Sequence, residues 1–380
     1  MMKKIYIPII AVLLFFACKE VFNPPVTSAV TGYLVVEGFI NSGNGASTIK
    51  LTRTTKLVDS AATIYEHNAQ VKIEDESNAT YPLYERDSGN YVSDNLFLNP
   101  ALKYRIHITT TNGDEYISDF TAVKQTPPID SISWKVENGG VQIYVNAHDA
   151  TNTTRYYQHK YSETWEFQSP FIKRITYVID PVSSKIIGVT ELPNADTSIF
   201  KCWRTQTPSN ILLTSTEKLS EDKVFLPIRY IEPKGGELSI LYYIEVRQYA
   251  LSHEAYLFKQ KLKKNTEQLG TIFDPQPSEL GGNVHCITNP SQQVVGFVDV
   301  TQEQVAKLFI NNKELTNWPQ TIPCSEEVVE NKPENYDPFL MPTHVYEYIG
   351  RNSIKSYYVA DPICVDCTLR GTNVKPLFWP

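Results

Sequence analysis

The sequence predicts a mainly β protein made of two antiparallel β-sandwich units, immunoglobulin-like or transthyretin-like, with one amphipathic helical segment near 252–269. Three observations support this class. Short runs that alternate apolar and polar residues recur about every 8–12 positions, and turn residues separate them. Aromatic residues make up 12% of the chain, and tyrosine alone occupies 23 positions, which suits pleated, half-buried surfaces. Only the segment that starts at Ser252 has helical periodicity.

The N-terminus is predicted to be a targeting segment followed by a tether. Two lysines precede an apolar run that fits a signal peptide and is shorter than the roughly 20 residues needed to span a bilayer. The run ends at Ala17-Cys18, and a cysteine after a small residue is where a bacterial lipoprotein is lipidated and cut. We expect removal of residues 1–17, acyl chains such as palmitate on Cys18, and a tether over 18–31. An ordinary secretory peptide or an uncleaved anchor is the alternative, because two phenylalanines precede Ala17.

Residues 32–125 are predicted to form the N-terminal β-sandwich. Each candidate strand either alternates apolar and polar residues or follows a turn. The candidate strands lie at 33–38, 47–54, 71–74, 104–108 and 115–123. In the second of these, Ile49 and Leu51 share the apolar face. Asn112-Gly113 predicts a hairpin turn. Two consecutive prolines after Thr126 predict the domain boundary, because proline stops strand pairing.

Residues 126–380 are predicted to form a second β-rich domain with a helical insertion and a C-terminal tail that contains cysteines. Its candidate strands lie at 132–136, 141–145, 155–167, 224–228 and 238–246. In the insertion, Ser252 is a suitable N-cap, and Ala255, Phe258 and Leu262 recur at helical spacing with lysines opposite. This helix is expected to cover the sandwich, with contact to a partner as the alternative.

The composition and motifs exclude several classes of function. A formal charge of −7 argues against nucleic acid as a partner, because phosphate binding needs a positive field. The sequence has no Gly-x-Ser-x-Gly elbow, no phosphate-binding Gly-Lys-Ser/Thr loop and no His-Glu-x-x-His zinc helix. The seven histidines are scattered singly, which disfavours a metal site. We therefore expect a protein that is not an enzyme and has no cofactor, no metal and no catalytic residues.

The cysteines divide into one predicted anchor and five others. Export permits disulfides among the five, which are Cys202, Cys286, Cys324, Cys364 and Cys367. The last two have zinc-knuckle spacing, but no second pair completes four ligands. Structural disulfides are favoured over a reactive thiol or a metal site. Five thiols leave at least one unpaired within the chain, and the pairing stays open.

Several longer motifs resemble a known family. In chain order they are Leu34-Val35-Val36-Glu37-Gly38, Glu163-Thr164-Trp165-Glu166-Phe167, Gly282-Asn283, Cys364-Val365-Asp366-Cys367 and Phe378-Trp379. Together they resemble the Bacteroidota lipoproteins catalogued as domain of unknown function 4249. The resemblance implies a setting beside TonB-dependent outer-membrane receptors, and it supplies no catalytic residues.

These observations lead to a functional hypothesis. We expect a lipoprotein anchored in the outer membrane through Cys18, on either the cell surface or the periplasmic face. Its expected partners are the lipid bilayer and a TonB-dependent receptor, for which it would capture a ligand or gate the barrel mouth. The alternatives are a structural or adhesion module, or a hydrolase of glycans or peptides whose carboxylates come from distant strands. The ligand stays unassigned.

Overall fold

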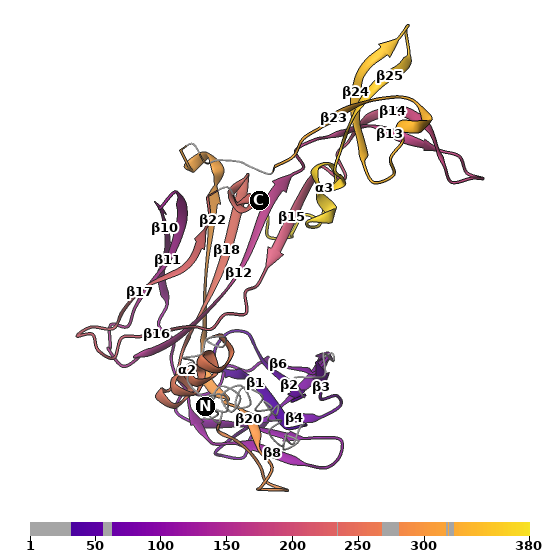
Figure 1. Ribbon diagram of the computed structural model, residues 1–380. Helices are drawn as coiled ribbons and strands as arrows, with labels where there is room; N and C mark the ends of the chain where they lie inside the picture. Colours follow the sequence, from indigo (N-terminus) through magenta and orange to yellow (C-terminus); the bar gives the residue numbers. More distant parts are fainter. Residues whose placement is uncertain (1–31, 56–62, 234, 268–280, 317, 319–322) are drawn as a thin grey trace, which may run out of the picture.

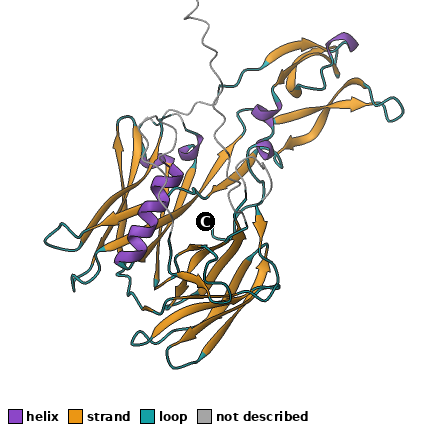
Figure 2. Cartoon of the chain, turned by 60° about the horizontal axis from the view of Figure 1, so that its bottom comes forward, coloured by secondary structure: helices purple, strands orange, loops and turns teal. Residues whose placement is uncertain are grey.

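The computed structural model describes residues 32–55, 63–233, 235–267, 281–316, 318 and 323–380. The predicted signal peptide, Cys18 and the tether over 18–31 lie outside these residues. Strands dominate the described chain, and the longest helix runs beside them (Figure 2), so the mainly β prediction is confirmed. Within the described residues, no helix has the length and apolar character needed to cross a membrane. The molecule divides into an N-terminal barrel, a central unit and a distal arm (Figure 1).

The N-terminal barrel is one twelve-stranded sheet. Its first nine strands follow one another in the chain, and three more come from much later in the sequence. They are β1 (Leu34–Asn41), β2 (Ala46–Arg53), β3 (Ile64–Tyr65), β4 (Gln70–Asp75), β5 (Thr80–Asp87), β6 (Asn90–Asn95), β7 (Lys103–Thr109), β8 (Glu115–Ser118), β9 (Thr121–Ala122), β19 (Val284–Cys286), β20 (Val294–Gly296) and β21 (Asp299–Thr301). β19 pairs with β8, while β20 and β21 pair parallel with β1. Because β19 and β20 contact each other, the sheet is nearly closed.

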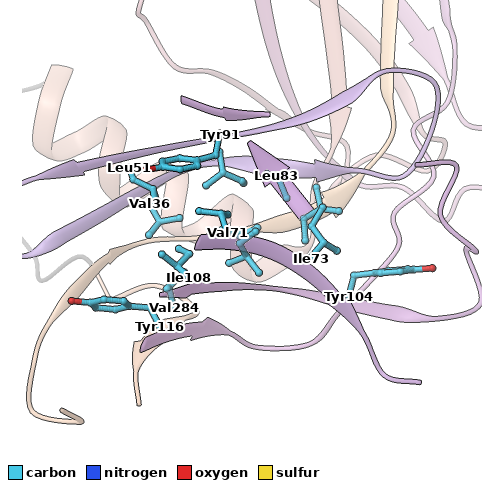
Figure 3. Packing of buried hydrophobic residues seen from close by; sticks show 14 of the residues in the cluster. Val36, Leu51, Val71, Ile73, Leu83, Tyr91, Tyr104, Ile108, Tyr116 and Val284 are labelled. Carbon is cyan, nitrogen blue, oxygen red and sulfur yellow. The ribbon is translucent and has the colours of Figure 1, made fainter. Parts of the chain in front are cut away.

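The barrel encloses the first hydrophobic core (Figure 3). The predicted alternation is confirmed here, because Ile49 and Leu51 are fully buried while Lys50 between them is not. Val71 and Ile73 point inward from β4, and Tyr104 does so from β7. Each inward side chain therefore alternates with an outward polar one, as a half-buried strand requires.

The sequence predicted a boundary at 125/126, yet residues 284–301 hydrogen-bond into the first sheet rather than the second domain. The prediction of two immunoglobulin-like or transthyretin-like sandwiches is likewise not confirmed, because the N-terminal unit is a single, nearly closed sheet. Periodicity identifies a strand but does not identify its partner. The pairing depends on where the chain returns in space, which here happens after about 160 residues.

The central unit contains a three-stranded and a five-stranded antiparallel sheet. The first orders as β10 (Ile129–Glu137), β11 (Gly140–His148) and β17 (Lys223–Ile231), and the second contains β12 (Tyr156–Gln168), β15 (Lys201–Gln206), β16 (Leu212–Ser215), β18 (Leu241–Ala250) and β22 (Glu303–Asn311). Both sheets contribute to one core, in which Ile143 of β11 meets Trp165 of β12 and Ile244 of β18.

The distal arm is built from two segments far apart in the chain. It comprises the hairpin β13 (Lys173–Ile179) and β14 (Ile186–Asp196), and the sheet of β23 (Glu327–Glu330), β24 (Met341–Ile349) and β25 (Ser353–Ala360). A small core around Ile175 and Tyr357 joins the two parts. The arm lies at the end of the molecule opposite the barrel (Figure 1). The sequence patterns predicted no strands in the distal arm.

In the part of the chain that the structure describes, the helices are few and short apart from one. They are α2 (His253–Glu267), α3 (Pro362–Val365) and 3-10 turns at Gly236–Leu238, Asn312–Glu314, Pro333–Asn335 and Cys367–Leu369. The predicted cap is present, because the Ser252 hydroxyl accepts the Ala255 backbone N–H at 3.1 Å. Ala255 and Phe258 are buried, and α2 contacts β12 and β16, so the helix covers strands as expected. The last two residues of the predicted helix, 268–269, lie outside the described residues.

Candidate functional site

The junction between the barrel and the central unit is tied by buried polar contacts. The Thr126 hydroxyl accepts the Ala250 backbone N–H of β18 at 2.9 Å and donates to the Gln302 carbonyl at 2.6 Å. The ring of Phe39 in β1 meets Tyr249 in β18 edge-on, with centroids 4.7 Å apart. Thr126, which the sequence placed at a domain boundary, is therefore one of the residues that join the two units.

A small recess lies at this junction. Its volume is about 40 Å³. The barrel lines it with β1 and β21, the central unit with β12 and β18, and α2 completes the lining. Phe39, Leu251 and Phe297 supply apolar walls, and Gln158, Lys160, Lys259, Asp299, Tyr249, Thr301 and Gly38 complete the lining. Four separate segments thus converge on one space, which we call the junction recess.

Two lysines face the junction recess without a salt bridge or a hydrogen bond to the described chain. Within the described residues, neither Lys160 nor Lys259 forms an ion pair or a hydrogen bond, although Lys160 lies 6.0 Å from the Tyr249 ring centroid. Lys259 is half-buried, whereas Lys160 keeps an accessible side chain at the opening. Burial and then the charge of Lys160 lower the pKa of Lys259 to about 8. Burial also lowers the pKa of Lys160.

The acidic groups of the junction are already engaged. The Asp299 carboxylate accepts the backbone N–H of Ser252 at 2.8 Å and that of Val300 at 3.1 Å. Burial raises the pKa of Asp299. Glu303 accepts from Arg247 at 2.9 Å and from the Tyr249 hydroxyl at 2.6 Å. Neither carboxylate forms a salt bridge with the two lysines, but Asp299 acts on Lys259 and Glu303 acts on Lys160 from a longer distance.

The structure forms two disulfides from the five candidate cysteines. Cys202 bonds to Cys367 and Cys324 bonds to Cys364, with Cα atoms 5.7 and 5.9 Å apart. Cys286 has a free, buried thiol in β19. Among the described residues, no group of three or more histidine, cysteine or acidic side chains is arranged to hold a metal ion. The Cys-x-x-Cys motif thus forms two structural bridges rather than half of a zinc site.

Buried carboxylates also occur in the central unit, and each has a structural partner. Glu163, 1% exposed, accepts from Arg229 at 2.9 Å and from the Tyr242 hydroxyl at 2.7 Å. Glu166 pairs with Lys201 at 2.7 Å and accepts the Trp379 indole N–H at 2.9 Å. Both glutamates lie in the motif at 163–167. Their ion pairs and hydrogen bonds give these two positions of the motif a structural role.

The distal arm carries the most exposed apolar side chains in the described chain after Leu377. Val182 at the tip of the β13–β14 hairpin is 92% exposed, and Phe339 before β24 is 82% exposed. Ile179, Ile187, Tyr346 and Ile349 are also more than half exposed. A larger recess of about 380 Å³ lies at the base of the arm beside the Cys324–Cys364 bridge. Single exposed apolar residues are ordinary, but such a gathering on one projection is typical of interaction sites.

Comparison with known proteins gives the family. A family model described as "Domain of unknown function (DUF4249)" matches residues 19–306, which is well over half of the chain. The chain belongs to this family. No curated protein matches it. One matching solved structure is described as "Complete structure of manganese lipoxygenase of Gaeumannomyces graminis and partial structure of zonadhesin of Komagataella pastoris". It is 10% identical, covers 59% of this chain and 90% of its own, and has a TM-score of 0.18, which is too low to support an argument.

The motifs that suggested DUF4249 have structural roles in this chain. A Cβ on Gly282 would lie 1.6 Å from the Gly296 carbonyl oxygen, so only glycine fits there. The Asn283 side chain bonds both backbone groups of Val298, at 2.8 and 3.0 Å. The matched span of the DUF4249 model ends at 306, so the cysteine motif and Phe378-Trp379 lie beyond it.

Sequence reasoning missed the junction recess altogether. Lys259 counted as one of the lysines opposite the apolar face of the helix, where a solvated position is the default expectation. Only the return of 284–301 to the barrel places Phe297 and Asp299 against this helix. No local signal in the sequence marks Lys259, although a hydrophobic Phe258 beside it shows where the buried face begins.

Proposed function

We propose that this DUF4249 chain is a lipoprotein anchored to the outer membrane through Cys18 and acts as a non-enzymatic accessory component of a TonB-dependent uptake system. It captures a ligand or gates the mouth of the receptor. The lipobox-like Ala17-Cys18 supports the anchor, and the family resemblance supports the receptor setting.

The observation that carries the proposal is the distal arm. Val182 and Phe339 are almost fully exposed on a projection whose own core is small. Exposed apolar surface of this kind is stabilised when a partner removes it from water, by about 25 cal/mol per Å². We infer that the arm is the surface that contacts the receptor.

The position of the anchor fits this arrangement. The tether over 18–31 leads into β1 of the barrel, and the arm lies at the opposite end (Figure 1). A chain of that length spans at most about 50 Å. An elongated molecule tethered at one end in this way can place its other end over a neighbouring protein in the same membrane.

Immunoprecipitation of the native lipoprotein from detergent-solubilised outer membranes tests the proposal. We expect a receptor barrel to co-purify with the wild type and to be reduced several-fold with Val182→Asp. Phe97→Asp is the matched control, because Phe97 is 69% exposed on the barrel and away from the arm. Cys18→Ala should move the protein out of the membrane fraction.

Two outcomes would contradict the proposal. One is reproducible absence of any receptor barrel from the wild-type precipitate. The other is unchanged recovery of the receptor with a Val182→Asp protein that stays in the membrane fraction. This result would show that the receptor contacts a surface other than the arm.

A further inference from the structure

The junction recess has room for only a small chemical group. Its volume of about 40 Å³ corresponds to roughly three water molecules at 10–15 Å³ each. A carboxylate or a phosphate head group is of this order. Lys160 lies at the accessible side of the recess, and Lys259 lies deeper, on α2.

Neither lysine of the recess has a carboxylate at salt-bridge distance within the described chain. Lys160 and Lys259 have no ion pair within the described chain, whereas Asp299 is held by two backbone N–H groups. Asp299 and Glu37 act on Lys259, and Glu37 and Glu303 act on Lys160, only from beyond salt-bridge distance, and Glu303 is bound to Arg247 and Tyr249. Asp299 supplies one negative charge to the recess, and ammonium groups without a contact partner in a partly apolar space are stabilised by a further anion that binds there.

A third polar side chain without a protein partner lines the recess. Gln158 is 8% exposed and lines the recess, yet its side-chain amide forms no hydrogen bond within the described chain. Its amide is therefore available to a molecule that enters the recess. An amide donor beside two ammonium groups is the donor set that an oxyanion accepts from.

We propose that the junction recess binds a compact oxyanion, a carboxylate or phosphate group, between Lys160, Lys259 and the Gln158 amide. The apolar walls of Phe39, Leu251 and Phe297 exclude water and strengthen these interactions. Because its lining comes from β1, β12, β18, β21 and α2, the bound anion also joins the barrel to the central unit. This site is independent of the receptor contact on the arm.

Lysine NMR on the intact protein tests the site with two probes, inorganic phosphate and acetate. Protein labelled with 13C at the lysine ε position reports the pKa of each ammonium, and Lys259→Met identifies the Lys259 signal. At constant ionic strength, we expect saturating probe to raise the pKa of Lys259 by at least about 0.5, because an anion favours the charged form. The stronger of the two probes shows whether the site prefers phosphate or carboxylate.

Variants and thermal unfolding complete the test. The probe should raise the Tm of the wild type and of Lys261→Met, whose lysine is exposed on the same helix, but not that of Lys259→Met. Unchanged pKa values of all lysine signals at 100 mM of both probes would overturn the proposal even if Lys259→Met failed to fold. Equal Tm increases in Lys259→Met and Lys261→Met would overturn it too, since they would show that the anion acts elsewhere.

Discussion

Charged side chains on the outer face of the barrel contribute to stability through local networks, and Glu74 is the clearest case. It accepts from Lys72 at 2.9 Å, from Arg105 at 2.8 Å and from His107 at 2.8 Å. Burial alone raises the pKa of Glu74, but hydrogen bonds from these three side chains outweigh it and lower the pKa to about 2. The folded state therefore favours the ionised carboxylate more than the unfolded chain does.

This shift predicts a pH-dependent stability contribution. A carboxylate with a lowered pKa stabilises the fold above its unfolded value of about 4.3, and that stability is lost as the pH falls toward 2. Allowing for solvent screening, Glu74→Gln should cost about 1–2 kcal/mol at pH 7 and almost nothing at pH 2. Urea unfolding at both pH values measures the difference, with the exposed Glu76→Gln as control. An equal loss at both pH values would contradict the electrostatic explanation.

At the scale of elements, the closure of the barrel depends on a close backbone contact. Gly282 precedes β19 and lies against the carbonyl of Gly296 at the end of β20. Asn283 then fixes the chain by bonding both the N–H and the carbonyl of Val298. Together these contacts place β19 and β20 at the two ends of the sheet and bring β21 to β1.

We expect Gly282→Ala to open this closure. Its Cβ would meet backbone that cannot move aside cheaply, so the loss should be about 2–3 kcal/mol. Faster amide hydrogen exchange over 284–300 is the measurement. Gly281→Ala is the matched control, because a Cβ at Gly281 meets nothing within 4 Å. Unchanged exchange in Gly282→Ala would show that the barrel closes without this contact.

At the scale of the whole molecule, the units are assembled from distant parts of the chain. Two disulfides link these parts near the base of the arm. Neighbouring Cys364 and Cys367 bond to Cys324 beside the arm and to Cys202 in the central unit. The sequence separations are 40 and 165 residues. Bridges that close such long loops restrict the unfolded chain by about 4–5 kcal/mol in the chain-entropy model.

The unfolding of the barrel and that of the central unit can be followed separately. All five tryptophans lie outside the barrel, whereas the free Cys286 thiol lies inside it. Removing the longer bridge with Cys202→Ala and Cys367→Ala should lower the urea midpoint of tryptophan fluorescence by an amount equivalent to about 2–5 kcal/mol. The urea concentration at which Cys286 becomes reactive to a thiol reagent should hardly change. A parallel fall of both midpoints would instead show that the barrel and the central unit unfold as one body.

The sequence determined the local structure of this protein. Alternation identified the inward faces of β2, β4 and β7, and Ser252 identified the start of α2. Each of these follows from interactions between residues close in the chain.

Only the tertiary structure decided which strands share a sheet, which cysteines pair and which charges meet. β19–β21 complete a barrel that begins about 250 residues earlier, and Lys160, Lys259 and Asp299 come together from three separate segments. The physical reason is that pairing across such distances is selected by the burial of whole sheets and by chain return. A pattern of neighbouring residues carries no record of either.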